Sequence, residues 1–216
     1  MTLIVTKKSG NSYPPIDGGT YQGICIGVID IGTQYNTYYQ KSMRKVVFVW
    51  ELPEVRIEVE KDGQTLNLPR VISKTYTTSL HEKSNLGKDL VSWRGRAFTQ
   101  EEEVGFDAES MLGSNCLVQI INSEKNGKTF ANVNSVSMLM TGMKTIKPES
   151  ELMKYSMDTG VQEPPENIYG WIKDLIKQSE EYKSVENARL NPDLQAAQAE
   201  HNVDEKPLPT EDDIPF

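Results

Sequence analysis

The 216-residue sequence predicts a mainly β protein in which five strands form a small barrel. Three observations predict this class. Runs of β-branched residues bounded by Gly, Pro, Asn and Asp recur through residues 1–140; a short helical pattern follows the third run; two more runs come after it. Three strands, a helix and two strands is the order of the OB-fold, a partly open five-stranded Greek-key barrel. An SH3-like barrel or a small sandwich gives a similar strand count, but the helix favours the OB arrangement.

The first three strands follow a turn-rich arm that ends near Gly19. The first strand carries Gly23 and Gly27, and glycines inside a strand suggest strong coiling or close approach of another backbone. The second strand is extended by a hairpin around Asp62-Gly63, a turn pair typical of hairpins. Residues 32–42 are polar and are expected to form a loop. The predicted strands are 20–31, 43–51 with its hairpin 56–68, and 70–80.

A short helix is predicted over 84–93, because its apolar residues recur at helical spacing and Gly95 suits a C-cap. Thr99 resembles the N-cap of a second helix with an acidic first turn. Residues 107–112 are expected to form a single turn. The last two strands are predicted at 115–123 and 128–140, joined by the hairpin signal Asn126-Gly127.

The composition changes after about residue 145. We expect an OB-fold domain at 1–145, a connector at 146–166, an amphipathic helix at 167–183 and a flexible acidic tail at 184–216. The helix is expected to dock on the barrel or to self-associate; a dedicated partner-binding helix is the alternative. Its predicted apolar side carries Ile168, Trp171, Ile172, Leu175, Ile176 and Tyr182.

Charge is divided unevenly along the chain. Residues 1–150 carry 17 Lys and Arg against 16 Asp and Glu, whereas residues 151–216 carry 6 against 15. A nearly neutral body can still bind DNA where its cations gather on one face. No secretory signal and no membrane span is predicted. Cys25 and Cys116 lie far apart among apolar residues, so we expect buried thiols of a cytosolic protein and no metal site.

The last six residues combine acidic and apolar groups: Glu211, Asp212, Asp213, Ile214, Pro215 and Phe216. A terminal Phe with acidic neighbours suits a peptide that docks elsewhere, with Phe in an apolar pocket and its carboxylate held by Arg or Lys. The hexapeptide resembles the acidic tip of bacterial and phage single-stranded DNA-binding proteins. That resemblance implies that the tip recruits enzymes of DNA replication, recombination and repair. The chain lacks the family's usual N-terminal strand motif and its Gly/Gln/Pro-rich tether, which points to a divergent, bacteriophage-encoded member.

Binding of single-stranded DNA needs cations for phosphates and flat side chains on which bases stack. In an OB barrel the groove crosses the second and third strands and is flanked by the first–second and fourth–fifth loops. Two of the candidates have an alternative role. Trp50 can instead belong to the hydrophobic core, and Arg94 and Arg96 can instead complement the C-terminus of the predicted helix. The predicted DNA-binding residues are Lys74, Tyr76, Arg44, Trp50, Tyr38, Tyr39, Lys41, Arg94 and Arg96.

These observations predict a non-enzymatic protein of the bacterial cytoplasm that coats single-stranded DNA and recruits enzymes through its tip. We expect no cofactor and no metal; a homo-oligomer is left open. A second hypothesis is an interaction protein that mimics the tip and diverts host enzymes without binding DNA. A metal-dependent nuclease using Glu101, Glu102, Glu103 and Asp107 is a third, but consecutive helical carboxylates point in different directions.

Overall fold

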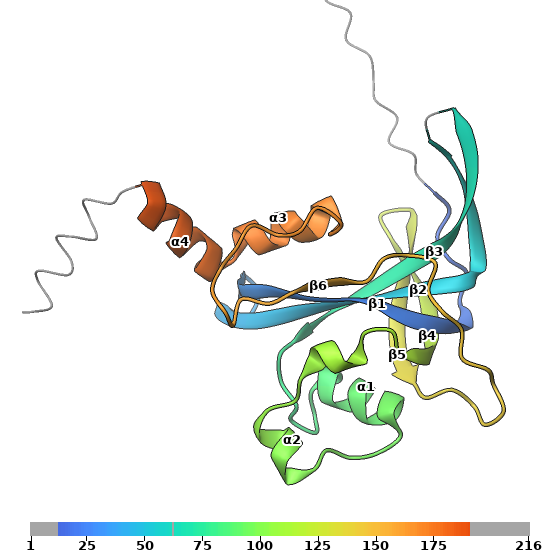
Figure 1. The fold of residues 1–216 in the computed structure, drawn as a ribbon, viewed down its shortest axis with the longest axis horizontal. Helices are drawn as coiled ribbons and strands as arrows, with labels where there is room; N and C mark the ends of the chain where they lie inside the picture. Colours follow the sequence, from blue (N-terminus) through green and yellow to red (C-terminus); the bar gives the residue numbers. More distant parts are fainter. Residues whose placement is uncertain (1–12, 62, 191–216) are drawn as a thin grey trace, which may run out of the picture.

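The computed structural model describes residues 13–61 and 63–190 and shows a mainly β protein (Figure 1). A curled antiparallel sheet of five strands forms a half-barrel, and a short sixth strand and several helices pack around it. The strands are β1 (Gly19–Asn36), β2 (Lys41–Lys61), β3 (Gln64–Thr77), β4 (Asn115–Lys125), β5 (Lys128–Ser137) and β6 (Met153–Tyr155). The helices are α1 (Asn85–Arg94), α2 (Gln100–Val104), the 3₁₀ turn η1 (Ala108–Met111), α3 (Gly170–Gln178) and α4 (Glu180–Leu190).

The sheet has the order β3-β2-β1-β4-β5, and its central strand β1 pairs with β2, with β4 and with the short β6. The first part of β1, Gly19–Ile24, pairs with β4, and the remainder pairs with β2. Two register shifts in β1 increase its twist and let the sheet curl. A Cβ at Gly23 would lie 2.8 Å from Val118 Cγ2, and one at Gly27 would lie 2.9 Å from Ile29 Cδ1. Both glycines therefore permit the close packing that the sequence indicated.

The inner face of the sheet packs on α1, which lies below it in Figure 1. Ser84 caps α1 by accepting a hydrogen bond from Gly87 N–H, and Gly95 ends it in the left-handed conformation at φ 68°. The predicted helix and its C-cap Gly95 are confirmed. The buried inner core includes Cys25, Val28, Val46, Phe48, Trp50, Ile72, Tyr76, Leu86, Leu90, Trp93, Cys116, Val118, Val133 and Val136.

A second core covers the opposite face of β1 and β2. There β6 pairs in parallel with β1, and α3 lies over the sheet (Figure 1). Apolar side chains of α3, of β6 and of the segment between them cover the outward residues of the two central strands, which are Ile26, Ile29, Ile31, Val47 and Val49. The covering residues include Met153, Ile168, Ile172 and Ile176. Burial on both faces explains why β1 and the middle of β2 are apolar at almost every position.

Several predicted boundaries differ from the structure. The predicted loop 32–42 is mostly strand, because β1 continues to Asn36 before a four-residue turn. The hairpin predicted within the second strand is the outer end of the long β2–β3 pair. The connector contains β6, which the sequence pattern did not predict. Strands β4 and β5 and the Asn126-Gly127 turn, with both φ angles positive, are confirmed.

The predicted helix at 167–183 is two helices, α3 and α4, separated at Ser179. Its expected docking on the sheet is observed, since Ile172 and Ile176 are fully buried. Trp171 is an exception and is 47% exposed. Helix α4 extends to Leu190, beyond the predicted start of the tail, and residues 191–216, including the tip, lie outside the described residues. Within the described part of the chain, every helix is too short or too polar to cross a bilayer.

Candidate nucleic-acid interface

Two aromatic residues predicted to bind DNA face the inner core. Trp50 and Tyr76 are 1% and 4% exposed, and both rings pack around Phe48 at centroid distances of 5.9 and 5.7 Å. Tyr76 Oη also donates a 2.6 Å hydrogen bond to Asp89 on α1. Burial, followed by the charge of Asp89, raises the pKa of Tyr76. Neither ring is open to a base. The alternating pattern correctly grouped the residues that share one face of β2 and β3, but that face packs into the inner core instead of being exposed.

Lys74 lies on the same inner face and is held by α1. Its Nζ lies 2.8 Å from Asp89 Oδ2 and donates a second hydrogen bond of 3.0 Å to the Asn134 carbonyl. The ammonium also lies 5.0 Å from the centre of the Tyr76 ring. These contacts join β3, α1 and β5. The cation of Lys74 is therefore occupied within the protein.

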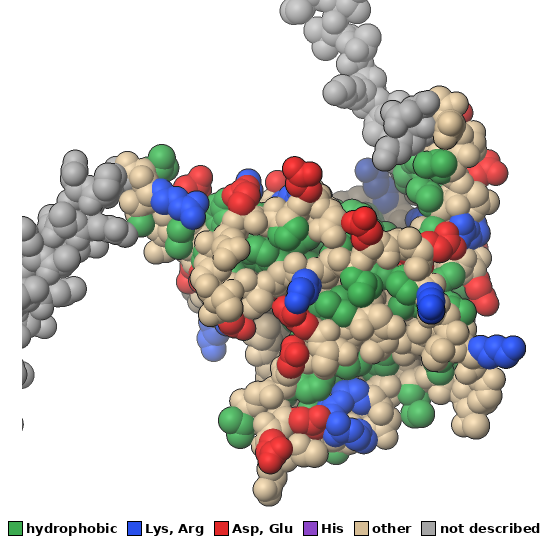
Figure 2. Space-filling model, viewed as in Figure 1, with side chains coloured by type: hydrophobic (Ala, Val, Ile, Leu, Met, Phe, Trp, Pro, Cys, Tyr) green, Lys and Arg blue, Asp and Glu red, His purple; other side chains and the backbone are tan. Residues whose placement is uncertain are grey.

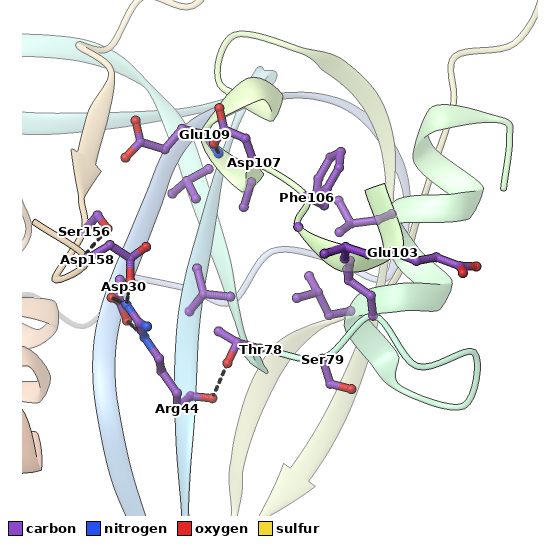
Figure 3. Close-up of a pocket in the computed structure, with 18 of the residues that line it drawn as sticks. Asp30, Arg44, Thr78, Ser79, Glu103, Phe106, Asp107, Glu109, Ser156 and Asp158 are labelled. Atoms are coloured by element: carbon purple, nitrogen blue, oxygen red, sulfur yellow. Dashed lines mark hydrogen bonds and ion pairs between the residues drawn. The ribbon is translucent and has the colours of Figure 1, made fainter. Parts of the chain in front are cut away.

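Arg44 lies in a cavity between the sheet and the α2–η1 segment. Its Nη2 is 2.5 Å from both Asp30 Oδ2 and Asp158 Oδ1. The hydrogen bond to Asp30 is the largest cause of the raised pKa of Arg44, and Arg44 in turn lowers the pKa of Asp158. Figure 3 shows these three side chains on one side of the cavity. With two carboxylates on its guanidinium, Arg44 has little capacity left for a phosphate.

This cavity of about 470 Å³ is here called the acidic pocket. Val28, Val46, Leu86, Leu90 and Phe106 supply apolar lining. Its charged lining consists of one guanidinium, Arg44, and five carboxylates: Asp30, Glu103, Asp107, Glu109 and Asp158. Asp107 and Glu109 face Asp30 and Asp158 across the opening (Figure 3). The pocket would repel a phosphate backbone.

Arg94 and Arg96 converge on Glu102. Arg94 forms an ion pair with Glu102 and lies between the rings of Phe98 and Phe106, with 4.7 Å from its Cζ to each centroid. Arg96 Nη2 lies 2.7 Å from the same carboxylate. These hydrogen bonds, Arg96 first, lower the pKa of Glu102.

The same carboxylate completes a capping box with Thr99 at the start of α2, so the predicted N-cap is confirmed. Glu102 is thus a structural anchor for the segment after α1. Among residues 13–61 and 63–190, no group of His, Cys, Asp and Glu has the arrangement of a metal site.

The turn between β1 and β2 presents exposed tyrosines. Tyr38 and Tyr39 are 85% and 64% exposed, and their rings meet edge to face at 4.9 Å. Asn36 Oδ1 accepts hydrogen bonds from both backbone N–H groups, at 3.0 and 3.1 Å, and so fixes the turn. Lys41 is exposed beside them. Of the predicted DNA-binding residues, these three are exposed and form no ion pair within the described residues, whereas the exposed Arg96 is paired with Glu102.

A second exposed group lies on the hairpin of β4 and β5 and was not predicted. Lys125 pairs with Lys128, Ser123 with Phe130 and Ile121 with Asn132, so all six side chains share one face. The opposite face packs Ala131 and Val133 against the inner core. Phe130 is 47% exposed, and neither lysine forms an ion pair with any residue of the described ranges. We call these six residues the outer β4–β5 face.

The outer β4–β5 face had a sequence signal that could have revealed it. After the Asn126-Gly127 turn, Lys128, Phe130 and Asn132 alternate with the inward residues Ala131 and Val133. A Phe in register with polar residues is a candidate for an exposed ring. By contrast, the face drawn in Figure 2, over α3 and β6, mixes acidic and basic side chains and shows no continuous basic band.

No family model matches the chain, and no curated protein matches it significantly. The function is therefore inferred from the chain's own residues.

Proposed function

We propose that this protein binds single-stranded DNA through an OB-fold barrel, largely without sequence preference, and recruits replication, recombination or repair enzymes through its last six residues. The observation that carries the DNA-binding part is the outer β4–β5 face. It combines an exposed aromatic ring with two unpaired lysines on adjacent strands. Stacking and phosphate neutralisation are the two interactions that sequence-tolerant binding requires.

The topology is compatible with this proposal. In the observed sheet, β1 pairs with both β2 and β4, and α1 follows β3 and precedes β4. An OB-fold has the same element order, and its ligand contacts the loops between strands 1 and 2 and between strands 4 and 5. The exposed tyrosines lie in the first of these loops, and the outer β4–β5 face lies on the two strands that lead into and out of the second.

The chemistry of each group fits a single strand. A base stacked on Phe130 or on a turn tyrosine contributes roughly 1–3 kcal/mol whichever base it is. Lys125, Lys128 and Lys41 would neutralise phosphates and release counterions, which adds affinity that falls with salt. Neither interaction reads base edges, so both predict weak sequence preference.

The recruiting part of the proposal depends on the sequence Glu211 to Phe216, which resembles the acidic tip of single-stranded DNA-binding proteins. A partner enzyme would bind Phe216 in an apolar pocket and meet the acidic residues with a basic rim. The alternative function, a mimic of the tip that diverts enzymes without binding DNA, shares this interaction. It differs in predicting no affinity for an oligonucleotide.

Fluorescence anisotropy with a labelled oligo-dT at moderate salt tests the DNA-binding part. We expect saturable binding that Phe130→Ala weakens about fivefold or more, a factor within the range expected when one base loses its stacking partner. Trp171→Ala is the matched control, because Trp171 is equally exposed but lies on α3. No binding by the folded protein would exclude the DNA-binding function.

Deleting residues 211–216 tests the recruiting part. We expect unchanged or higher affinity for oligo-dT, because an acidic segment competes with DNA for cations. The full chain should pull down DNA-processing enzymes, and the chain that lacks residues 211–216 should not. A large loss of DNA affinity would contradict the separation of the two activities.

A further inference from the structure

The acidic pocket plays no part in the proposed DNA binding, yet its chemistry is specific. Apolar side chains of β1, β2 and α1 line it, and its carboxylates come from β1, from the α2–η1 segment and from the segment after β6. Arg44 neutralises part of this charge, and Lys154 forms a 3.1 Å ion pair with Glu109. Asp107 has no ion-pair partner within the described residues; Glu103 has none either, but its carboxylate points away from the cavity (Figure 3). An occupant should combine an apolar part with positive charge.

A segment of this chain outside the described residues has that composition. Residues 1–12 contain Leu3-Ile4-Val5, followed closely by Lys7-Lys8, and no acidic residue. The β-branched residues favour an extended conformation. We infer that the acidic pocket binds residues 1–12 of a neighbouring copy of this chain, with the apolar residues in the pocket and the two lysines at its carboxylates.

The position of Pro14 favours a neighbouring copy. Arg70 donates a 3.0 Å hydrogen bond to the Pro14 carbonyl, and Arg70 pairs with Leu52 on β2. Along β2, the eight residues from Leu52 to Arg44 span about 26 Å. The six residues from Lys8 to Pro14 extend at most about 21 Å. Only a fully extended segment would bring the lysine side chains of one molecule near its own acidic pocket, which favours a second molecule as their source.

A binding assay without DNA tests this inference independently of the proposed function. A fluorescein-labelled peptide of residues 1–12 is titrated with the chain that lacks residues 1–12, a deletion that removes none of the described elements. We expect saturable binding that weakens at least tenfold when the peptide carries Lys7→Glu and Lys8→Glu. Absence of binding, or equal binding of the charge-reversed peptide, would overturn the proposal.

Variants of the pocket locate the binding site. Asp107→Asn with Glu109→Gln removes two charges and keeps a capping side chain for η1, and it should weaken the peptide at least fivefold. Glu101→Gln is the matched control, since Glu101 is exposed on α2 and does not line the pocket. If the double variant and the Glu101→Gln control weaken peptide binding equally, the peptide does not bind in the acidic pocket.

Sedimentation velocity distinguishes a neighbouring copy from the chain's own segment. The full chain should self-associate as its concentration rises, whereas the shortened chain should stay monomeric. A full chain that stays monomeric while its pocket is closed to the labelled peptide would show that the chain fills its own pocket. That result would overturn the assignment to a neighbour.

Discussion

Lys74 on β3 and Asp89 on α1 form an ion pair in the partly buried inner core, with 2.8 Å between Nζ and Oδ2. Asp89 also accepts the hydroxyl hydrogen bond of Tyr76 at 2.6 Å. The pair fixes α1 against the sheet and takes Lys74 out of the set of cations available to DNA.

Asp89→Ala is expected to lower the free energy of unfolding by about 3 kcal/mol, because it leaves an ammonium and a hydroxyl without their partner. Urea denaturation followed by circular dichroism measures this loss. Asp174→Ala, at an exposed position of α3, is the control and should stay within about 0.5 kcal/mol of the unmodified protein.

Lys74→Met should cost less than Asp89→Ala, because Asp89 keeps the Tyr76 hydroxyl as a donor. Its affinity for oligo-dT should match that of the unmodified protein once folding is confirmed. If the Lys74→Met variant is as stable as the unmodified protein but binds oligo-dT clearly more weakly, Lys74 contacts the DNA.

Glu181 anchors α4 to the central strand. Its carboxylate accepts hydrogen bonds from the Thr33 N–H at 2.7 Å and the Thr33 hydroxyl at 2.6 Å. Burial acts to raise the pKa of Glu181, but the hydrogen bonds from Thr33, a backbone hydrogen bond within Glu181 itself and the charge of Arg44 together outweigh it, and the pKa is lowered from 4.5. The ionised form therefore stabilises the folded state above about pH 4.5, and this contribution is lost as the pH falls through the lowered pKa.

Glu181→Gln should lower the free energy of unfolding at pH 7 by about 1.5 kcal/mol, the contribution of a charged hydrogen bond. Its difference from the unmodified protein should shrink as the pH falls below 4.5, measured by urea denaturation at a series of pH values. Glu186→Gln, exposed on the same helix, should leave the pH profile unchanged. A difference that stays constant at every pH down to acid unfolding would mean that packing, not ionisation, causes the loss.

The lysines of the outer β4–β5 face should set part of the salt dependence of DNA binding. Replacing Lys125 and Lys128 with Ala should reduce the slope of log K against log salt by about 0.7 for each phosphate that is no longer neutralised. Oligo-dT titrations between 50 and 300 mM salt, on the order of one decade, give this slope. Lys83→Ala with Lys88→Ala, two exposed lysines near or on α1, is the matched control. If both pairs of substitutions change the slope equally, single-stranded DNA does not bind preferentially to the outer β4–β5 face.

Both cysteines should resist thiol reagents in the folded protein. Burial raises the pKa of Cys25 to about 12, against a smaller opposing effect of a backbone hydrogen bond with Gly27, and burial also raises the pKa of Cys116. At pH 8 about one Cys25 thiol in 10⁴ would be ionised, and thiolate is the reactive form. A chromogenic disulfide reagent should therefore label two thiols only after denaturation. Thr141→Cys, an exposed site, should react at once and shows that the reagent works; rapid labelling of the unmodified native protein would contradict the predicted burial.

Local signals in the sequence determined the elements whose stabilising contacts lie within a few residues. Gly95 ends α1, Thr99 caps α2, and Asn126-Gly127 closes the β4–β5 hairpin as predicted; the N-cap Ser84 was not predicted. Each of these depends on backbone hydrogen bonds or φ angles within one turn of chain. The five strands followed from β-branched runs, which are a local preference, although their pairing joins residues far apart in sequence, such as Gly23 and Cys116.

Tertiary structure alone decided which faces are buried. Alternation groups Phe48 with Trp50 and Val47 with Val49, but both groups are apolar, so the pattern does not say which face is covered. Packing of α1 on one side and α3 on the other buried both, because those contacts join residues far apart in sequence. The same long-range packing paired Lys74 with Asp89 and left the ring of Phe130 exposed, which moved the candidate DNA interface from the middle of the sheet to its hairpin ends.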